Sequence, residues 1–280
     1  MASKLLYNLN MLNKTYLISL LISLLLIAMT SSLQAKEPSW SSIVPEKLKR
    51  TTRANFSERN HLLFKYFLSS SLHSKGKKDF RKISKKMKNK IFWKGNRRKN
   101  IYLDAYHRSY PSVKRMELRA DIPEIVLLIP YLESLWHSRS GNPAADYGYW
   151  QLVLPIVVEI QQLETSPEHI KRASPNKIRS NAALSTQVAL LHLRRYYFYF
   201  AKVANHTETD AWLFAMISYN WGAGNVKRML ARMENKGITG DFSNFYHYLY
   251  ATQQLYQGDR SLKAALEYLP SLWNIAKVIR

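Results

Sequence analysis

The sequence predicts an all-α fold. Apolar residues recur at helical spacing in several segments, and the longest of these runs from Asn181 to Val203. No segment shows the alternation of apolar and polar residues that is typical of a strand, and no internal repeat is visible. With 280 residues, of which 46% are hydrophobic, the chain can form one packed domain with additional segments.

Residues 1–35 are predicted to be an export signal or an N-terminal anchor. Lys4 and Lys14 give the start a positive charge, a 14-residue apolar stretch spans 16–29, and the sequence SSLQA ends at Ala35. This stretch is short for a membrane-spanning helix, which needs about twenty apolar residues. We therefore expect the protein to act outside the cytoplasm, with the signal either cleaved or kept as an anchor.

Residues 36–100 are predicted to be a basic N-terminal region. From Lys75 to Lys99 the chain has thirteen Lys or Arg residues and one acidic residue, Asp79, and the preceding segment 61–72 has the pattern of an apolar helix. The basic run has three interpretations: a solvated linker, an amphipathic helix or an anion-binding surface. The apolar face of such a helix would consist of Phe80, Ile83, Met87 and Ile91.

The formal net charge of +23 favours contact with a polyanion. Nucleic acid is a common partner of so basic a chain, but the predicted export signal argues against it. The candidates are anionic polymers of the cell envelope and anionic membrane surfaces, bound through residues 75–99. The chain has no Cys, which excludes disulfides, thiol catalysis and cysteine-ligated metals. The sequence indicates no metal or organic cofactor.

The segment 101–119 is expected to form a pair of helices with a buried stripe of tyrosines. A further helix is expected from residue 122, where apolar residues recur at helical spacing. Asp121 would cap this helix, and Glu124 would complete a capping box. Pro130 is expected to bend its last turn, which places Glu133 at the C-terminal end of a buried helix.

Glu133 occupies a position that is unfavourable for a charged carboxylate. The negative end of the helix dipole and the apolar neighbours Leu132, Leu135 and Trp136 would all disfavour the charged form. Both effects raise the pKa of Glu133, which suits a general acid near neutral pH. The alternative is a solvated or ion-paired glutamate at a helix end.

The loop 137–147 is rich in turn-forming residues and leads into the turn GYWQ at 148–151. A helix is expected to start near Pro155. Asn181 is the expected cap of the long helix, in which His192 is interpreted as structural.

Another helix is expected to begin at Thr209 or Asp210 and to end in the segment SYNWGAGN, residues 218–225. Gly222 and Gly224 would break the helix there and allow close approach of the backbone. Helical stretches separated by glycine turns are expected from 226 to 280.

Three motifs, taken in order, resemble those of the lytic transglycosylases of the lysozyme-like superfamily, glycoside hydrolase family 23. They are ES at 133–134, GYWQ at 148–151 and SYNWGAG at 218–224, with fifteen positions from Glu133 to Gly148 and seventy-one from Gly148 to Tyr219. The tail elements GDFSNF and EYLP, at 240–245 and 267–270, are similar to the membrane-bound D-like branch, although no LysM repeat is present. The resemblance covers about residues 100 to 280, and it implies a lysozyme-like helical catalytic domain at 101–280.

The resemblance further implies a periplasmic or envelope enzyme that cleaves the MurNAc–GlcNAc β-1,4 bond of peptidoglycan glycan strands and forms 1,6-anhydroMurNAc. One glutamate acts first as acid and then as base. A second carboxylate is not needed, because the sugar's own 6-hydroxyl is the nucleophile. By the same resemblance the catalytic residue is Glu133, and the substrate-binding residues are Ser134, Gly148, Gln151, Tyr219, Asn220 and Tyr268.

Two residues depart notably from the family pattern. Asp146 stands where the family has Ala, and Trp221 stands where it has a small residue, so the cleft would be narrower or differently charged. Two alternatives remain open. One is a non-catalytic envelope protein that binds peptidoglycan or acts as a scaffold on the same fold, and the other is a hydrolase in which Asp146 activates water.

Overall fold

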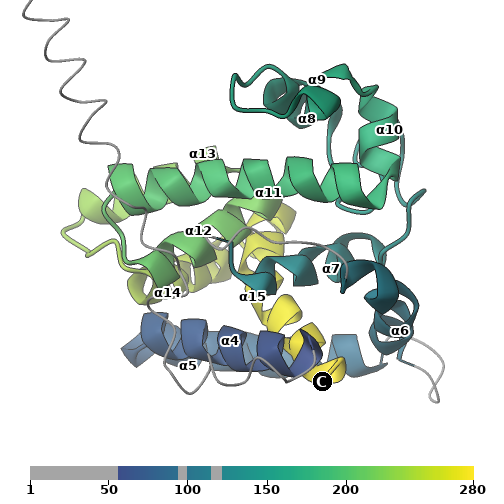
Figure 1. The fold of residues 1–280 in the computed structure, drawn as a ribbon. Helices are drawn as coiled ribbons and strands as arrows, with labels where there is room; N and C mark the ends of the chain where they lie inside the picture. Colours follow the sequence, from purple (N-terminus) through teal and green to yellow (C-terminus); the bar gives the residue numbers. More distant parts are fainter. Residues whose placement is uncertain (1–55, 94–99, 115–121) are drawn as a thin grey trace, which may run out of the picture.

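The computed structural model describes residues 56–93, 100–114 and 122–280, which form an all-α structure (Figure 1). The predicted signal at 1–35, the capping role of Asp121 and the basic residues 94–99 lie outside this part of the chain. Within it, the only pairing of β type consists of two isolated bridges, Gly141–Tyr147 and Tyr147–Leu152. None of the described helices combines the length and apolar character needed to cross a bilayer.

The first helices of the structure are α4 (Phe56–Ser71), α5 (Ser74–Trp93), α6 (Ile101–Val113), the 3-10 helix η2 (Glu124–Leu128) and α7 (Ile129–Ser134). The central part consists of α8 (Leu154–Gln161), α9 (Glu168–Arg172), α10 (Pro175–Ser180), α11 (Ala182–Phe198), the π-helix η3 (Tyr199–Val203) and α12 (Glu208–Trp221). The last helices are α13 (Ala223–Glu234), α14 (Phe242–Leu255) and α15 (Arg260–Val278).

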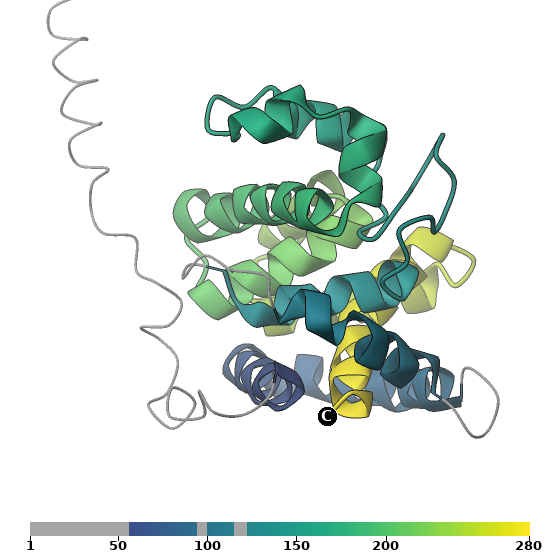
Figure 2. The ribbon, with the colours of Figure 1, turned by 45° about the vertical axis from the view of Figure 1, so that its right-hand side comes forward.

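Helix α12 forms the centre of the fold, and every residue from Thr209 to Ser218 is buried. It packs against α4, α11, α13, α14 and α15. Figures 1 and 2 show α8, α9 and α10 above α11, while α4 and α5 lie on the opposite side of the molecule. Helix α7 lies between these two parts, so the segment around Glu133 is placed near the middle of the molecule (Figure 1).

Helix α5 is amphipathic, which confirms the second of the three interpretations of the basic run. Its apolar positions Phe80, Ile83, Met87 and Ile91 are all buried. They pack against α14 and α15, so α4 and α5 share one hydrophobic core with the helices that follow. The division of the chain at residue 100 remains a prediction.

The segment before Glu133 differs from the single capped helix that the sequence predicts. Glu124 does not complete a capping box; its carboxylate forms an ion pair with Arg59 of α4, at 2.9 Å. Pro130 lies in the first turn of α7 and does not bend its end. A proline is favoured at that position because the first N–H groups of a helix have no intrahelical acceptor.

Of the cap residues predicted for the two longer helices α11 and α12, one is confirmed and the other is wrong. Asn181 caps α11 as predicted, since its side chain accepts a hydrogen bond from the backbone N–H of Leu184. Helix α12 is capped by Thr207, and the prediction of Thr209 or Asp210 is wrong. The carboxylate of Asp210 instead accepts from the backbone N–H of Phe242 at the start of α14.

Two further predictions about helix ends need correction. Gly222 ends α12 with a φ of +79°, as expected, but Gly224 lies inside α13 and breaks no helix. The segment after residue 100 is described as one helix, α6, which Asn100 caps through its side-chain oxygen. A second helix of the predicted pair would fall mainly in 115–121, outside the described residues.

Candidate active site

Glu133 lies in the last turn of α7, next to the point where the backbone reverses. Leu135 and Trp136 both adopt left-handed conformations, with φ of 53° and 57°, and so end the helix. The carboxylate Oε1 of Glu133 accepts a hydrogen bond of 2.9 Å from the hydroxyl of Tyr268. This bond joins α7 to α15, which are 135 positions apart at these two residues.

The pKa of Glu133 is raised from 4.5 to about 7. Burial of the carboxyl group is the largest cause, the hydrogen bond from Tyr268 acts in the opposite direction, and the negative charge of Asp146 raises the pKa further. The direction of this shift confirms the prediction from the sequence. The side chain of Glu133 nevertheless keeps partial access to solvent, as an acid that meets a substrate requires.

Two tyrosines provide neutral hydroxyl groups around this carboxyl group. The hydroxyl of Tyr219, from α12, donates to the backbone carbonyl of Trp150 at 2.7 Å. The pKa values of Tyr219 and Tyr268 lie well above the ordinary value because both are buried and both lie near the carboxylate of Glu133. Both therefore remain protonated phenols at neutral pH.

Ser134 and Gln151 bind the backbone of the neighbouring loop. The hydroxyl of Ser134 donates to the carbonyl of Tyr149 at 2.6 Å. The amide of Gln151 donates to the carbonyls of Ser140 and Gly148, at 3.0 and 2.8 Å. These contacts hold the loop against the helix that carries Glu133, and the substrate-binding roles of the two residues remain predictions.

Arg179 is a residue of this site that sequence reasoning missed. It is 1% exposed, and its guanidinium donates to the carbonyls of Pro143 and Ala145 at 2.6 and 2.9 Å. It thereby fixes the part of the loop that precedes Asp146. Nothing in the surrounding sequence PNKIRS distinguishes Arg179 from the exposed Lys177 of the same segment.

Gly148 also contacts this arginine, through the backbone. Its φ is +82°, and a Cβ atom at this position would lie 1.9 Å from the carbonyl oxygen of Arg179. Only glycine at position 148 therefore allows these two backbone segments to lie so close together. The requirement predicted for Gly148 is thus structural in origin.

Asn220 and Trp221 form no hydrogen bond with the carboxyl group of Glu133 or with the loop beside it. Asn220 is exposed, and its side chain forms no hydrogen bond within the described ranges. The indole of Trp221 donates to the hydroxyl of Ser261 at 2.7 Å, at the start of α15. The predicted role of Asn220 remains a prediction.

His192, for which the sequence suggested no partner, packs beside the site. Its ring lies 4.3 Å from that of Tyr196 and 6.1 Å from that of Tyr219, measured between centroids. Burial lowers the pKa of His192 to about 4, and the positive charge of Arg195 contributes. The imidazole is therefore neutral at pH 7, in keeping with a structural role. In the described part of the chain, no group of three or more His, Asp and Glu residues could hold a metal ion.

The raised pKa of Glu133 predicts a stability effect that is independent of activity. In the unfolded chain this group ionises near 4.5, whereas in the folded chain it ionises near 7, so stability falls as the pH rises between these values. At 1.4 kcal/mol per pKa unit the full cost above pH 7 is about 3 kcal/mol, an upper bound because the side chain is partly exposed. Glu133→Gln is expected to raise the melting temperature at pH 8 and to change it little at pH 4. An equal effect at both pH values would contradict the assignment.

Comparison with known families adds one finding. Residues 112–242 match the family model described as the Transglycosylase SLT domain. No curated protein matches this sequence. The matched segment contains Glu133, the loop, Arg179 and Tyr219, and it ends before α15, which contributes Tyr268.

Proposed function

Residues 112–242 of this chain are a transglycosylase SLT domain of the lysozyme-like superfamily, and from this premise we propose that the protein is a peptidoglycan lytic transglycosylase. The bond cleaved is the β-1,4 bond between MurNAc and GlcNAc. The observation that carries the proposal is the carboxyl group of Glu133, which is hydrogen-bonded to Tyr268 and has a pKa of about 7. Such a group can both donate and accept a proton at neutral pH.

In the first step, protonated Glu133 donates its proton to the glycosidic oxygen, and the bond from this oxygen to the anomeric carbon of MurNAc breaks. In the second step, the carboxylate takes the proton of the 6-hydroxyl of the same MurNAc, whose oxygen forms a new bond to the anomeric carbon. The proton is thus returned to Glu133, and no water is consumed. The hydroxyl of Tyr268 donates to the carboxylate and stabilises the anion between the two steps.

The neutral hydrogen-bonding groups around the acid suit an uncharged glycan. We assign substrate binding to the segment of Tyr219 and Asn220 and to the loop that Ser134, Gly148 and Gln151 hold in place. Asp146 is exposed on this loop and lies close enough to raise the pKa of Glu133. A hydrolytic reaction, with Asp146 as the base that activates water, is the alternative outcome of the same experiment.

The experiment is mass spectrometry of purified sacculi digested with the full-length protein, beside a Glu133→Gln control. Products lighter by one water molecule than hydrolytic muropeptides, and absent with the variant, are the expected result. Products of hydrolytic mass would overturn the transglycosylase reaction in favour of a water-activating base. Sacculi that bind the protein but stay intact would leave a non-catalytic peptidoglycan-binding protein on this fold.

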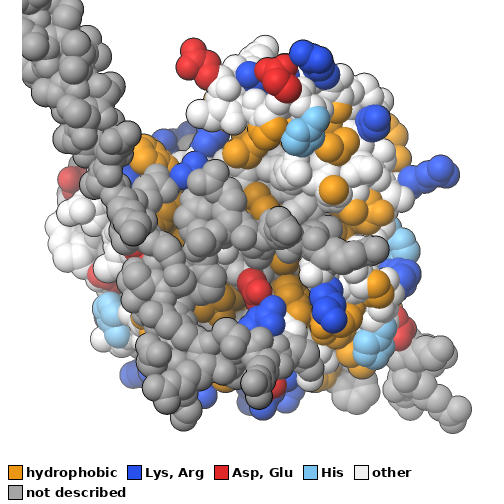
Figure 3. Space-filling model, viewed as in Figure 1, with side chains coloured by type: hydrophobic (Ala, Val, Ile, Leu, Met, Phe, Trp, Pro, Cys, Tyr) orange, Lys and Arg blue, Asp and Glu red, His pale blue; other side chains and the backbone are white. Residues whose placement is uncertain are grey.

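We further propose a periplasmic or envelope location, with residues 1–35 as signal or anchor, 36–100 as a basic region and 101–280 as the catalytic domain. The support is the N-terminal sequence pattern together with a wall polymer as the proposed substrate. The basic helix α5 would hold the enzyme on an anionic envelope polymer or membrane surface. Lys and Arg side chains emerge along the lower edge of the molecule in Figure 3, where Figure 1 places α4 and α5.

The outward face of α5 carries several cations that are exposed and form no ion pair with a described residue. They are Lys75, Lys77, Lys78, Arg81 and Lys85. The double variant Arg81→Gln and Lys85→Gln is expected to reduce co-sedimentation with vesicles of anionic lipid or with polyanionic wall polymer, most strongly at low salt. Unchanged sedimentation at low salt would rule out this face as the contact.

A further inference from the structure

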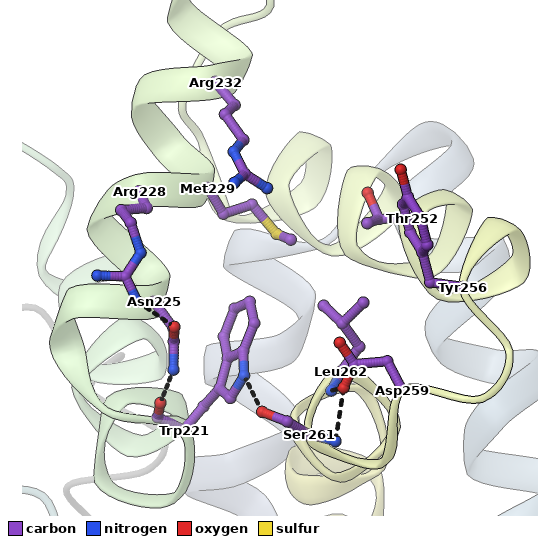
Figure 4. Close-up of a pocket in the computed structure, with 10 residues that line it drawn as sticks. All are labelled: Trp221, Asn225, Arg228, Met229, Arg232, Thr252, Tyr256, Asp259, Ser261 and Leu262. Carbon is purple, nitrogen blue, oxygen red and sulfur yellow. Dashed lines mark hydrogen bonds between the residues drawn. The ribbon is translucent and has the colours of Figure 1, made fainter.

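A pocket of about 390 Å³ lies between α13, the end of α14 and the start of α15 (Figure 4). Trp221 lines it at the end of α12, immediately after the predicted substrate-binding residues Tyr219 and Asn220. Its opposite wall comes from residues beyond 242, where the family match ends. Glu133 does not line this pocket, so it is distinct from the site described above.

The charge of the pocket comes from two arginines of α13. Arg228 and Arg232 are four residues apart, so they lie on the same side of the helix one turn from each other. Arg228 donates a hydrogen bond to the side-chain oxygen of Asn225. Neither arginine forms an ion pair with any residue that the structure describes, and Figure 4 shows the guanidinium of Arg232 directed across Met229 towards the pocket.

The acidic residue in the wall of the pocket does not neutralise these arginines. The carboxylate of Asp259 caps α15, where it accepts hydrogen bonds of 2.8 and 3.0 Å from the backbone N–H groups of Ser261 and Leu262. Its negative charge therefore interacts with the positive end of the dipole of α15. The guanidinium of Arg232, and that of Arg228 beside Asn225, therefore have no anionic partner among the described residues and can bind a carboxylate, which arginine binds, as it binds phosphate, in planar, bidentate geometry.

Aromatic rings complete the pocket on two sides. The indole of Trp221 is held by its hydrogen bond of 2.7 Å to the hydroxyl of Ser261, and Tyr256 stands opposite with 62% of its surface exposed. Rings at these places would pack against the carbon skeleton of a ligand. The pocket therefore suits an organic carboxylate with an aliphatic chain better than a small inorganic anion.

The position of the pocket along α15 relates it to the acid. Ser261, which holds Trp221, and Tyr268, which holds Glu133, are seven residues apart and lie on the same face of this helix. A rise of 1.5 Å per residue separates them by about 10 Å along the axis. The residue that holds the pocket's indole and the residue that holds the carboxylate of Glu133 are therefore about two helical turns apart on one helix.

We propose that the pocket binds a carboxylate of the stem peptide on the peptidoglycan strand that is cut at Glu133. This inference rests on the proposed function, which supplies a glycan substrate that carries acidic peptides. Arg228 and Arg232 bind the carboxylate, and Trp221 and Tyr256 contact the aliphatic part of the peptide. The pocket thus gives the enzyme a preference for peptide-bearing over peptide-free glycan.

The test compares two substrates, soluble glycan strands that carry their stem peptides and the same strands stripped of peptides by an amidase. The full-length protein is expected to cut peptide-bearing strands more efficiently. The double variant Arg228→Gln and Arg232→Gln is expected to lose about tenfold in kcat/KM on these strands, with no change on stripped strands. The variant Arg228→Lys and Arg232→Lys, which keeps the charge but loses the bidentate geometry, is expected to be intermediate.

The double variant Lys65→Gln and Lys202→Gln is the matched control, because it removes the same charge from two exposed cations that lie outside both the pocket and the basic helix α5. It is expected to keep the preference for peptide-bearing strands. An equal loss in this control, or an equal loss on both substrates in the pocket variant, would overturn the inference. If the wild-type protein cuts neither substrate, the proposed function itself fails.

Discussion

Replacing Glu133 with Gln is expected to lower the rate of peptidoglycan cleavage by roughly a thousandfold. Glutamine has the shape of glutamate but can neither donate a proton to the glycosidic oxygen nor accept one from the 6-hydroxyl. Its amide oxygen can still accept the hydrogen bond from Tyr268, so the arrangement of α7 and α15 should be retained. The measurement is the initial rate of release of soluble muropeptides from sacculi.

The matched control is Glu159→Gln, which changes an exposed glutamate that pairs with Arg195 at 2.7 Å. Its rate is expected to stay within about twofold of wild type, because a surface ion pair contributes little to stability. The wild-type rate should fall as the pH rises through about 7, since the first step needs the protonated form of Glu133. A Glu133→Gln variant that keeps a tenth of the wild-type rate would show that another group is the acid.

Gly148→Ala is expected to give the second large effect, through the loop and not through the chemistry. The added Cβ would lie 1.9 Å from the carbonyl oxygen of Arg179, on a residue whose φ is already +82°. Because the obstacle is backbone, neither partner can move away cheaply. We expect a loss of about 3 kcal/mol or more, a melting temperature lower by about 6–12 °C, and loss of nearly all activity.

The control is Gly237→Ala. This glycine has a φ of +66°, but an added Cβ would meet nothing within 4 Å. The Gly237→Ala variant should therefore lose only the free energy that a left-handed alanine costs, about 1 kcal/mol of folding stability, and should keep its activity. Circular dichroism and thermal melting of both variants separate the two effects. Equal melting temperatures would contradict the close contact between Gly148 and Arg179.

Much of the helical content follows from local sequence. The apolar spacing of the basic run predicts the buried face of α5, and Asn181 has the chemistry of the cap that it forms. The direction of the pKa shift of Glu133 is also predicted from the sequence, and burial is its largest cause. In the cases of α5 and Asn181 the deciding residues lie within about three helical turns of each other.

The predictions that are wrong concern side chains whose hydrogen-bond partners are far away in the sequence. Glu124 has the spacing of a capping box, but its carboxylate pairs with the guanidinium of Arg59, 65 positions earlier. Asp210 resembles a cap of its own helix, yet its carboxylate accepts a hydrogen bond from the backbone N–H of Phe242 in the first turn of α14. No local pattern reveals which distant donor will reach a carboxylate.

The sequence by itself determined the all-α class, the raised pKa of Glu133, the motifs around this residue and the amphipathic character of α5, since helix periodicity and short-range chemistry decide these features. Only the tertiary structure decided that the hydroxyl of Tyr268 donates to the carboxylate of Glu133, that Arg179 anchors the loop and that Arg228 and Arg232 line a pocket with Trp221. These contacts join residues that are distant in the chain. They exist because burying the apolar faces of the helices brings their polar groups together, where each must find a partner.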